Sequence, residues 1–456
     1  MQKFEGEHLL PGQLGHFFII LALVSSLIAL ISFFNASRTQ NETDKNQWMK
    51  FAKINFAIQA FSILFIFCTV FYICYNHYYE YMYAYKHASK ELETKFLLAC
   101  IWEGQEGSFI LWMFWQALLG IILIRTQKEW EAPVMSIFAL VQAFLSSMIL
   151  GVVIPGIELK IGSSPFILLR EAMQDPIFAT NPDFIPADGH GLNPLLQNYW
   201  MVIHPPTLFL GFAATLIPFS FCLSGLYFKK YTEWIKPALP WALFGGTVLG
   251  IGILMGGYWA YETLSFGGYW NWDPVENAVY VPWLILVAAI HTMMLYKSKQ
   301  RGLGISIILV VSVFLLILYS TFLTRSGILG DASVHSFTDL GLSGQLLVYL
   351  LVFCAGAILL IALRWKQLPL KADEIEVYAP EFWVFLGMAA LCLMGFQVLI
   401  PTSFPVINKV LGLAGIQSSL APPADQIGFY SKLQLWFAVS VAMLSDRKST
   451  RLNSSH

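Results

Sequence analysis

The run GISIILVVSVFLLILYSTF at residues 304–322 contains no charged side chain. About 20 mostly apolar residues in a helix cross the hydrocarbon core of a bilayer, where every backbone polar group must be paired within the segment. The whole chain of 456 residues is 57% hydrophobic and only 12% charged, which is far from the composition of a soluble domain. These features predict an all-α fold, a polytopic bundle of transmembrane helices.

Eleven segments of the chain come near the length of a membrane span. They cover residues 15–34, 54–76, 108–125, 134–154, 205–228, 239–257, 278–296, 304–322, 344–363, 381–400 and 431–445. Lys and Arg gather in the short loops after odd-numbered spans, for example at Lys229, Lys230 and Lys236. Because loops rich in basic residues stay in the cytoplasm, we expect the N-terminus and the loops after even-numbered spans on the outer side.

The composition of the chain changes abruptly near its end. From residue 446 it reads DRKSTRLNSSH, and the last apolar run stops short of a membrane thickness. We therefore predict a membrane-spanning core over residues 1–445 and a non-native tail over residues 446–456, with a natural cytoplasmic tail as the alternative. The net charge of −1 gives no support for nucleic acid as a partner.

The predicted loop on the outer side after the sixth span is unusually aromatic. It reads YWAYETLSFGGYWNWDPVENAVYVPW at residues 258–283, and nine of these residues are Trp, Tyr or Phe. Flat, rigid side chains at this density favour a platform for a flat apolar ligand. An aromatic belt at the membrane surface is the alternative. Asp273 and Glu276 could fix this loop by hydrogen bonds or move protons.

Three histidines stand out by their predicted positions. His204, in a His-Pro-Pro sequence, opens the fifth span, and His335 lies in the outer loop after the eighth span. A helix start and a solvated loop are the alternative explanations for these two. His291 lies about 13 residues into the seventh span, roughly 20 Å below the outer surface. An ionisable side chain at that depth indicates a function, although an interhelical hydrogen bond would also account for it.

These features together are typical of a haem site. Imidazole is a preferred axial ligand of haem iron, and His204 and His335 would approach it from two separate loops on one side of the membrane. Gly267 and Gly268 would allow close approach of the backbone to the ligand. The side chains that could line the porphyrin are Trp259, Tyr269, Trp270 and Trp272.

Two further features belong to the predicted outer side. Arg325 is the single basic residue of its loop and could pair with a haem propionate, although it could also reach up to lipid headgroups. The segment WEGQEGSFILW at residues 102–112 places two carboxylates at the membrane surface. It could support the aromatic loop or cap a helix.

The order of these motifs resembles the CcmF family. The matching stretches are WEGQEGS, HPPTLFLGF, GGYWNWDPVEN at residues 267–277, AAIHTMML, and FLTRSG followed by VHSF. That family is the membrane haem lyase of the multi-component cytochrome c maturation system. The resemblance covers residues 5–445, and GGYWNWDPVEN is similar to the tryptophan-rich WWD signature of haem-handling proteins.

The resemblance implies a function and a set of partners. A haem delivered by the chaperone CcmE would be held by the WWD loop and two outer histidines, which match His204 and His335. It would then be joined by thioethers to apocytochrome c, with a CcmH-type subunit handling the thiols. A second, b-type haem would lie within the membrane. The first of its two histidine ligands matches His291, and quinol is a candidate electron donor.

This sequence departs from the family pattern in two ways. Tyr269 and Trp270 stand where Trp-Trp is common, and the family chain continues beyond the end of this one and carries the second ligand of the b-type haem there. We predict a haem lyase of the bacterial inner membrane with its WWD loop on the periplasmic side. The alternatives are a haem transporter or exporter without ligation chemistry, a membrane b-haem quinol oxidoreductase, and a solute permease.

Overall fold

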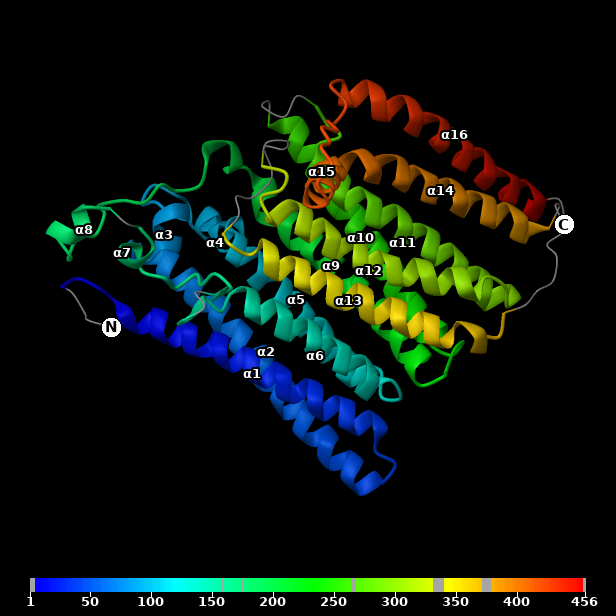
Figure 1. Ribbon diagram of the computed structural model, residues 1–456, viewed down its shortest axis with the longest axis horizontal. Coiled ribbons are helices and arrows are strands. Elements are labelled where there is room, and N and C mark those ends of the chain that lie inside the picture. Colours follow the sequence, from blue (N-terminus) through cyan, green and yellow to red (C-terminus); the bar gives the residue numbers. More distant parts are fainter. Residues whose placement is uncertain are drawn as a thin grey trace. The chain divides into compact units, whose positions relative to one another are not determined.

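The computed structural model describes residues 5–156, 159–173, 175–263, 268–330, 340–370 and 379–453. Two of the predicted site residues, Gly267 and His335, lie outside these ranges. The long helices are α1 (Leu9–Arg38), α2 (Glu42–Tyr75), α5 (Gln105–Thr126), α6 (Glu131–Met148), α9 (Tyr199–Tyr227), α10 (Ile235–Glu262), α11 (Pro274–Lys299), α12 (Leu303–Arg325), α13 (Ser343–Arg364), α14 (Pro380–Thr402) and α16 (Gln426–Asn453) (Figure 1).

Shorter elements connect these helices. They are α3 (Met82–His87), α4 (Thr94–Glu103), α7 (Leu169–Ala172), α8 (Ile177–Thr180), α15 (Phe404–Leu413), the single 3₁₀ turns η1 (Pro194–Leu196) and η3 (Trp365–Gln367), and the strands β1 (Val152–Ile154) and β2 (Leu159–Ile161). The two strands pair antiparallel, with Val153 opposite Lys160. Among the described residues they form the one sheet.

The prediction of eleven membrane spans is confirmed. Eleven helices of the described chain are long and apolar enough to cross a membrane, and each contains one of the predicted segments or most of it. The all-α prediction is confirmed as well. The backbone of α16 continues to Asn453, past the change in composition at residue 446, so the foreign origin of the tail stays a prediction.

Several helix ends differ from the predicted spans, and two of these differences have a local cause. The fourth span ends at Met148 rather than near residue 154, because Gly151 turns the chain with a positive φ of 65° into β1. The fifth span begins at Tyr199 rather than at residue 205. Here the prediction missed a helical turn because it took the two prolines after His204 for the first turn of the helix.

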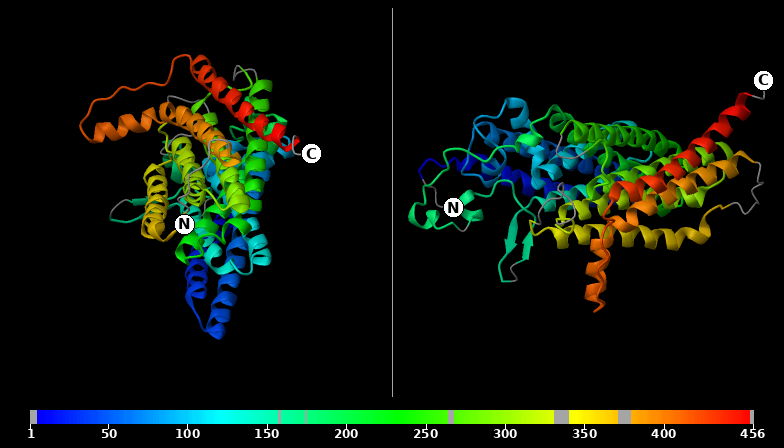
Figure 2. Two further views of the ribbon diagram at one scale, coloured as in Figure 1. Left: turned by 90° about the vertical axis from the view of Figure 1, so that its right-hand side faces the viewer. Right: turned by 90° about the horizontal axis from the view of Figure 1, so that it is seen from above.

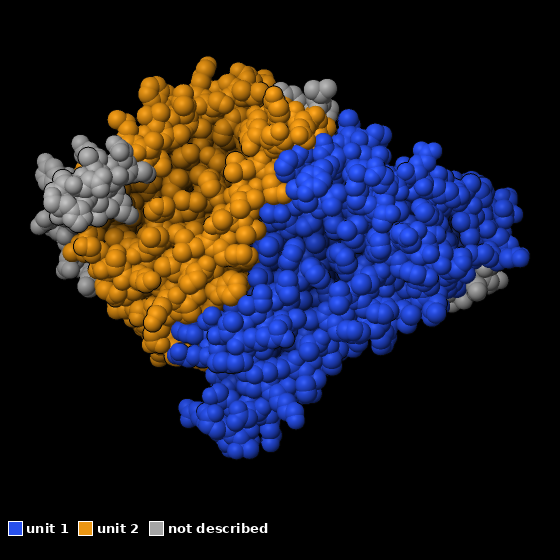
Figure 3. Space-filling view, turned by 180° about the vertical axis from the view of Figure 1, so that it is seen from behind, with its two compact units in different colours: residues 1–213, 340–345 blue, residues 214–339, 346–456 orange. Residues whose placement is uncertain are grey.

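The chain forms two compact units, which Figure 3 shows in two colours. The first contains residues 1–213 and 340–345, and the second contains residues 214–339 and 346–456. Helices α1, α2, α5 and α6 pack together in the first unit, and α11 packs against α10, α12 and α14 in the second. In Figure 2 α15 runs across the direction of α14 and α16.

Candidate functional site

The aromatic stretch joins α10 to α11, and its polar residues shape the start of α11. Asp273 is the N-cap, and its Oδ1 accepts a hydrogen bond from the N–H of Val275 at 2.8 Å. Glu276 reaches back and accepts from the N–H groups of Asn271 at 3.0 Å and Asp273 at 3.1 Å. These bonds form a capping box. Both carboxylates therefore fix the loop, which is one of the two roles expected for them.

Loss of this cap has a measurable expected cost. We expect Asp273→Ala to lower the free energy of unfolding by about 1 kcal/mol, because the first turn of α11 loses a hydrogen-bond acceptor. Glu276→Gln is the matched control, since glutamine also serves in a capping box. Denaturation in detergent micelles measures both changes. An unchanged stability of Asp273→Ala would contradict the role given to this carboxylate.

Trp272 is the anchor of the aromatic loop. Its side chain is 9% exposed, and its Nε1 donates to the Oγ of Ser431 at 3.0 Å. The indole stacks on Tyr430 at a centroid distance of 5.3 Å and meets the rings of Trp270 and Tyr280 edge to face. With a φ of 58°, Trp272 has a backbone conformation rare for a bulky residue. The structure thus places this indole in a hydrophobic core formed with α14 and α16.

The other predicted aromatic residues lie in more open positions. Tyr269 is 43% exposed, and its hydroxyl donates to the carbonyl of Leu254 at 3.1 Å. Trp270 is partly exposed, whereas its Nε1 is buried and has no hydrogen-bond partner among the described residues. Trp259, near the end of α10, is also partly exposed. A Cβ added to Gly268 would lie an ordinary 3.5 Å from Asn271, so protein packing alone does not require glycine there.

His291 has one ring nitrogen available. Its Nδ1 lies 2.8 Å from the carbonyl oxygen of Val287. Because a carbonyl only accepts, Nδ1 carries the hydrogen, and the lone pair of the neutral ring is then on Nε2. Metal-bound histidines commonly donate their other N–H in this way. The side chain is exposed, and it lies nearer to the Lys299 end of α11 than to Pro274.

His204 and Arg325 differ in their surroundings. His204 is partly exposed on α9 in the first unit, whereas the aromatic loop, His291 and Arg325 belong to the second unit. Arg325 is 8% exposed, and its Nη1 donates to the Oγ1 of Thr324 at 2.9 Å. A side chain reaching up to lipid headgroups would be more exposed than this, so the burial of Arg325 argues against that alternative.

The His-Pro-Pro sequence and the WEGQEG segment meet in the first unit. Proline has no N–H, so Pro205 leaves the carbonyl of Met201 without its helical partner. The Nε1 of Trp102 donates to that carbonyl at 2.9 Å. This contact was not predicted from the sequence. The only signal for it was the pair of prolines, which the structure places inside α9 rather than at its first residue.

The two carboxylates of the WEGQEG segment are also paired within the first unit. Glu103 lies 2.6 Å from the Nδ1 of His87, and Glu106 accepts a hydrogen bond from Ser163 at 2.6 Å. A Cβ at Gly107 would overlap the carbonyl of Ile101, so glycine is required in the first turn of α5, directly after its break from α4. The N-cap of α5, Gly104, has no side-chain cap. The two carboxylates therefore do not cap the helix and instead tie the segment to His87 and Ser163.

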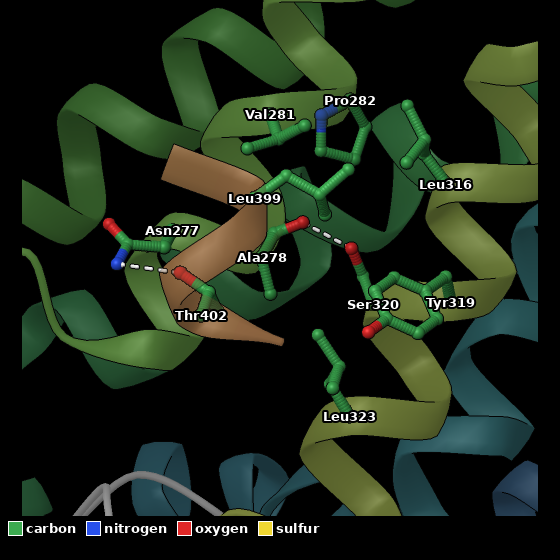
Figure 4. Close-up of a pocket in the computed structure, with 10 residues that line it drawn as sticks. All are labelled: Asn277, Ala278, Val281, Pro282, Leu316, Tyr319, Ser320, Leu323, Leu399 and Thr402. Carbon is green, nitrogen blue, oxygen red and sulfur yellow. Dashed lines mark hydrogen bonds between the residues drawn. The ribbon is translucent and has the colours of Figure 1, made fainter. Parts of the chain in front are cut away.

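A small cavity lies beside the aromatic loop in the second unit. Its volume is about 10 Å³, enough for one water molecule and far too small for a haem. In Figure 4 Asn277 donates to the Oγ1 of Thr402 at 3.1 Å, and Ser320 donates to the carbonyl of Ala278. Asn277 also donates to the carbonyl of Trp272 at 2.9 Å. The polar residues of this wall hold the loop against α14.

The described residues suit a haem better than a bare metal ion. Among them no group of three or more His, Cys, Asp or Glu could hold a metal ion, whereas haem iron takes only axial ligands from the protein. His291 offers its Nε2, and Trp270 offers an aromatic face beside a buried, unpaired N–H. His335 and Gly267 lie outside the described residues, so their roles stay predictions.

Comparison with known proteins gives one consistent family. A family model described as "Cytochrome C assembly protein" matches residues 102–329. The "Cytochrome c-type biogenesis protein CcmF" of Haemophilus influenzae is 31% identical over 427 residues, which are 91% of this chain and 60% of that protein. The protein of the same description from Escherichia coli is 29% identical over 368 residues, which are 79% of this chain and 52% of that protein.

A solved structure described as "Cytochrome c Heme Lyase CcmF" has the same fold. The TM-score is 0.71 at 20% sequence identity, and the match covers 97% of this chain and 62% of that one. The chain thus spans less than two thirds of the length of these similar proteins. The matched residues 102–329 include the WEGQEG segment, His204, the aromatic loop, His291 and Arg325.

Proposed function

Since the chain belongs to the cytochrome c assembly protein family, with CcmF proteins as its relatives, we propose that it binds haem and takes part in attaching it covalently to apocytochrome c. The observation that carries this proposal is the aromatic loop within the matched region. It is held rigidly at Trp272 and presents partly exposed rings at Tyr269 and Trp270. Rigid, pre-positioned rings bind a flat ligand with little loss of conformational entropy.

The residues of the chain would divide the work as follows. Asp273 and Glu276 fix the loop, and its open rings would cover one face of the porphyrin and exclude water. His204 and His335 would hold the iron of the haem at this site, and Arg325 would pair with a propionate. When bound, haem supplies the vinyl groups to which cysteine thiols add, together with the redox chemistry of its iron. Catalysis would then rest on proximity and orientation rather than on a general acid or base.

His291 would serve a second haem, of b type, within the membrane. The support for this is its Nε2, left as an acceptor by the bond of Nδ1 to Val287. An exposed imidazole on a spanning helix is costly in contact with lipid, so a ligand role also explains why the residue is there. Quinol is the proposed source of electrons for this haem.

The proposed partners follow from the same chemistry. Haem would come from the loaded chaperone CcmE, a CcmH-type subunit would present reduced thiols, and apocytochrome c would be the acceptor. The burial of Cys100, which raises the pKa of its thiol, argues against this cysteine as a reactive thiolate. We place the chain in the bacterial inner membrane, with its N-terminus and the aromatic loop on the periplasmic side.

The test is the optical spectrum and pyridine haemochrome of the purified protein after loading with haem. We expect His204→Ala, His335→Ala and His291→Ala each to change the spectrum or lower the haem content, because each removes a proposed axial ligand. His190→Ala is the control, because it removes an exposed histidine that has no proposed role as a ligand. The ring of His190 lies 4.5 Å from that of Tyr85. Three variants with the haem content and spectrum of the parent would show that the ligand assignments are wrong.

A further inference from the structure

The bundle of the first unit has polar side chains in its interior. In this bundle α1 packs against α2 and α6, and α5 also packs against α2 and α6. All four helices are long and apolar enough to cross a membrane, and Figure 1 shows them extending side by side. Polar groups midway along such helices have no solvent with which to form hydrogen bonds. Each of them therefore needs a partner inside the bundle.

Three glutamines in this interior lack such partners. Gln59 on α2, Gln116 on α5 and Gln142 on α6 are each 0% exposed. Among the described residues, neither amide atom of Gln59 or Gln116 has a hydrogen-bond partner, and the Oε1 of Gln142 has none. The Nε2 of Gln142 donates to the carbonyl of Met113 at 3.0 Å. Five amide atoms in one bundle are thus buried and unpaired, which is costly.

Contacts between α2 and α5 give the register of these two helices. A Cβ at Gly120 would overlap the ring of Phe56, and the rings of Phe67 and Phe114 lie 5.4 Å apart. The sequence number rises along α2 between these contacts and falls along α5. The two helices therefore run in opposite directions.

This register brings Gln59 and Gln116 within about two helical turns of each other in height. Gln59 follows Phe56 by three residues, and Gln116 precedes Gly120 by four residues. At a rise of 1.5 Å per residue, the two glutamines differ in height by about 2 Å when counted from the Phe56–Gly120 contact and by about 9 Å when counted from the Phe67–Phe114 contact. Residues three or four apart share one face of a helix, so both side chains point toward the α2–α5 contact.

The other two helices add polar groups close to this level. Gln142 bonds the carbonyl of Met113, which is three residues, or about 5 Å along the helix, from Gln116. On α1, the ring of Phe18 lies 4.0 Å from that of Phe65, and Ser25, 2% exposed, then falls close to the level of the glutamine on α2. All four helices thus carry a buried polar side chain in one layer.

The chemistry of this layer selects its ligand. Each amide both donates and accepts hydrogen bonds, so a ligand that satisfies the set must do both as well. The three glutamine side chains are neutral, and a cation bound by them alone would lie in the bundle without a counter-charge. Water donates and accepts, and buried waters typically make about three hydrogen bonds to groups of this kind. We propose that ordered water binds between Gln59, Gln116 and Gln142.

Hydroxyl-radical labelling in H₂¹⁸O tests this proposal with a built-in reporter. Met113 is 0% exposed, and its backbone carbonyl accepts the hydrogen bond of Gln142. Met293 is likewise 0% exposed, on α11 in the second unit. Radicals formed from bound water oxidise side chains that bulk water cannot reach. We expect ¹⁸O incorporation at Met113 to exceed that at Met293 in the folded parent protein. Equal labelling of the two methionines would overturn the proposal and indicate that the amides bond one another directly.

Variants show whether the glutamines hold the water. We expect the triple variant Gln59→Leu, Gln116→Leu, Gln142→Leu to lose the excess labelling of Met113, because the layer then has no amide to bind water. Should this variant fail to fold, Gln116→Met serves as a variant of similar volume and should reduce the excess. The control is Gln434→Leu, which removes a buried glutamine whose Nε2 is bonded to Met394. Excess labelling that persists in a folded triple variant would overturn the assignment.

Discussion

Replacement of Trp272 by alanine is expected to lower the free energy of unfolding by about 3–5 kcal/mol, the usual cost of removing a large buried aromatic side chain. The indole packs against Val281 and Val398 and stacks on Tyr430. Alanine would leave a cavity there and would remove the hydrogen bond to Ser431. Chemical denaturation in detergent micelles measures the change.

Tyr269→Ala is the matched control for this prediction, since it removes an aromatic ring from the same loop. Tyr269 is 43% exposed and makes one hydrogen bond, to Leu254, so its loss should cost about 1 kcal/mol or less. For the same loss of stability, Tyr269→Ala should weaken haem binding more than Trp272→Ala, because Tyr269 is the more open ring. Equal stability of the two variants would contradict the division of the loop into an anchor and an open surface.

Most of the fold could be predicted from the sequence because hydropathy reports the physical constraint directly. The backbone N–H and C=O groups of a run such as residues 304–322 cannot form hydrogen bonds with water inside a bilayer. Such a run must therefore form a helix, and its length shows that the helix spans the membrane. Helix ends depend on individual hydrogen bonds instead. The start of α9 at Tyr199 was missed because the carbonyl freed by Pro205 is satisfied by Trp102, a residue 99 positions away from Met201.

The aromatic loop could be found from the sequence, but which of its rings are buried and which are open could not. Trp270 and Trp272 look alike in a linear pattern, yet only Trp272 bonds Ser431, which is 159 residues away. Its positive φ also leaves no signature in residue type, since glycine or asparagine would be usual there. The capping box of Asp273 and Glu276 is local and could be anticipated. His335 lies outside the described residues and stays a prediction.

The buried glutamines illustrate the limit of hydropathy in another way. One amide in an apolar run changes the mean hydropathy little, so Gln59, Gln116 and Gln142 drew no attention as separate residues. Only the register of three helices shows that these glutamines lie close together in one layer. Polar groups inside a spanning bundle commonly mark function or specific helix pairing, and the proposed water site is one form of such pairing.

The second large effect that we expect is a loss of holocytochrome c formation. The variant His204→Ala should abolish most of this formation. The assay is the amount of covalently bound haem in c-type cytochrome, in cells that lack their own CcmF-type protein and express this chain. A residue that only hydrogen-bonds a metal ligand contributes about 10- to 100-fold to metal affinity. Loss of a proposed ligand itself should therefore lower the yield by at least about tenfold.

His190→Ala is the matched control in this assay, because it removes an exposed histidine from the same unit, and it should keep the parent yield. Comparing haem export in the same cells separates the two functions considered for the site. A transporter without ligation chemistry would lose export together with holocytochrome in His204→Ala, whereas a lyase would lose holocytochrome while export stays intact. Absence of holocytochrome with the parent chain would contradict the lyase function of this chain. The haem spectrum of the purified protein would then decide whether haem binding alone is its activity.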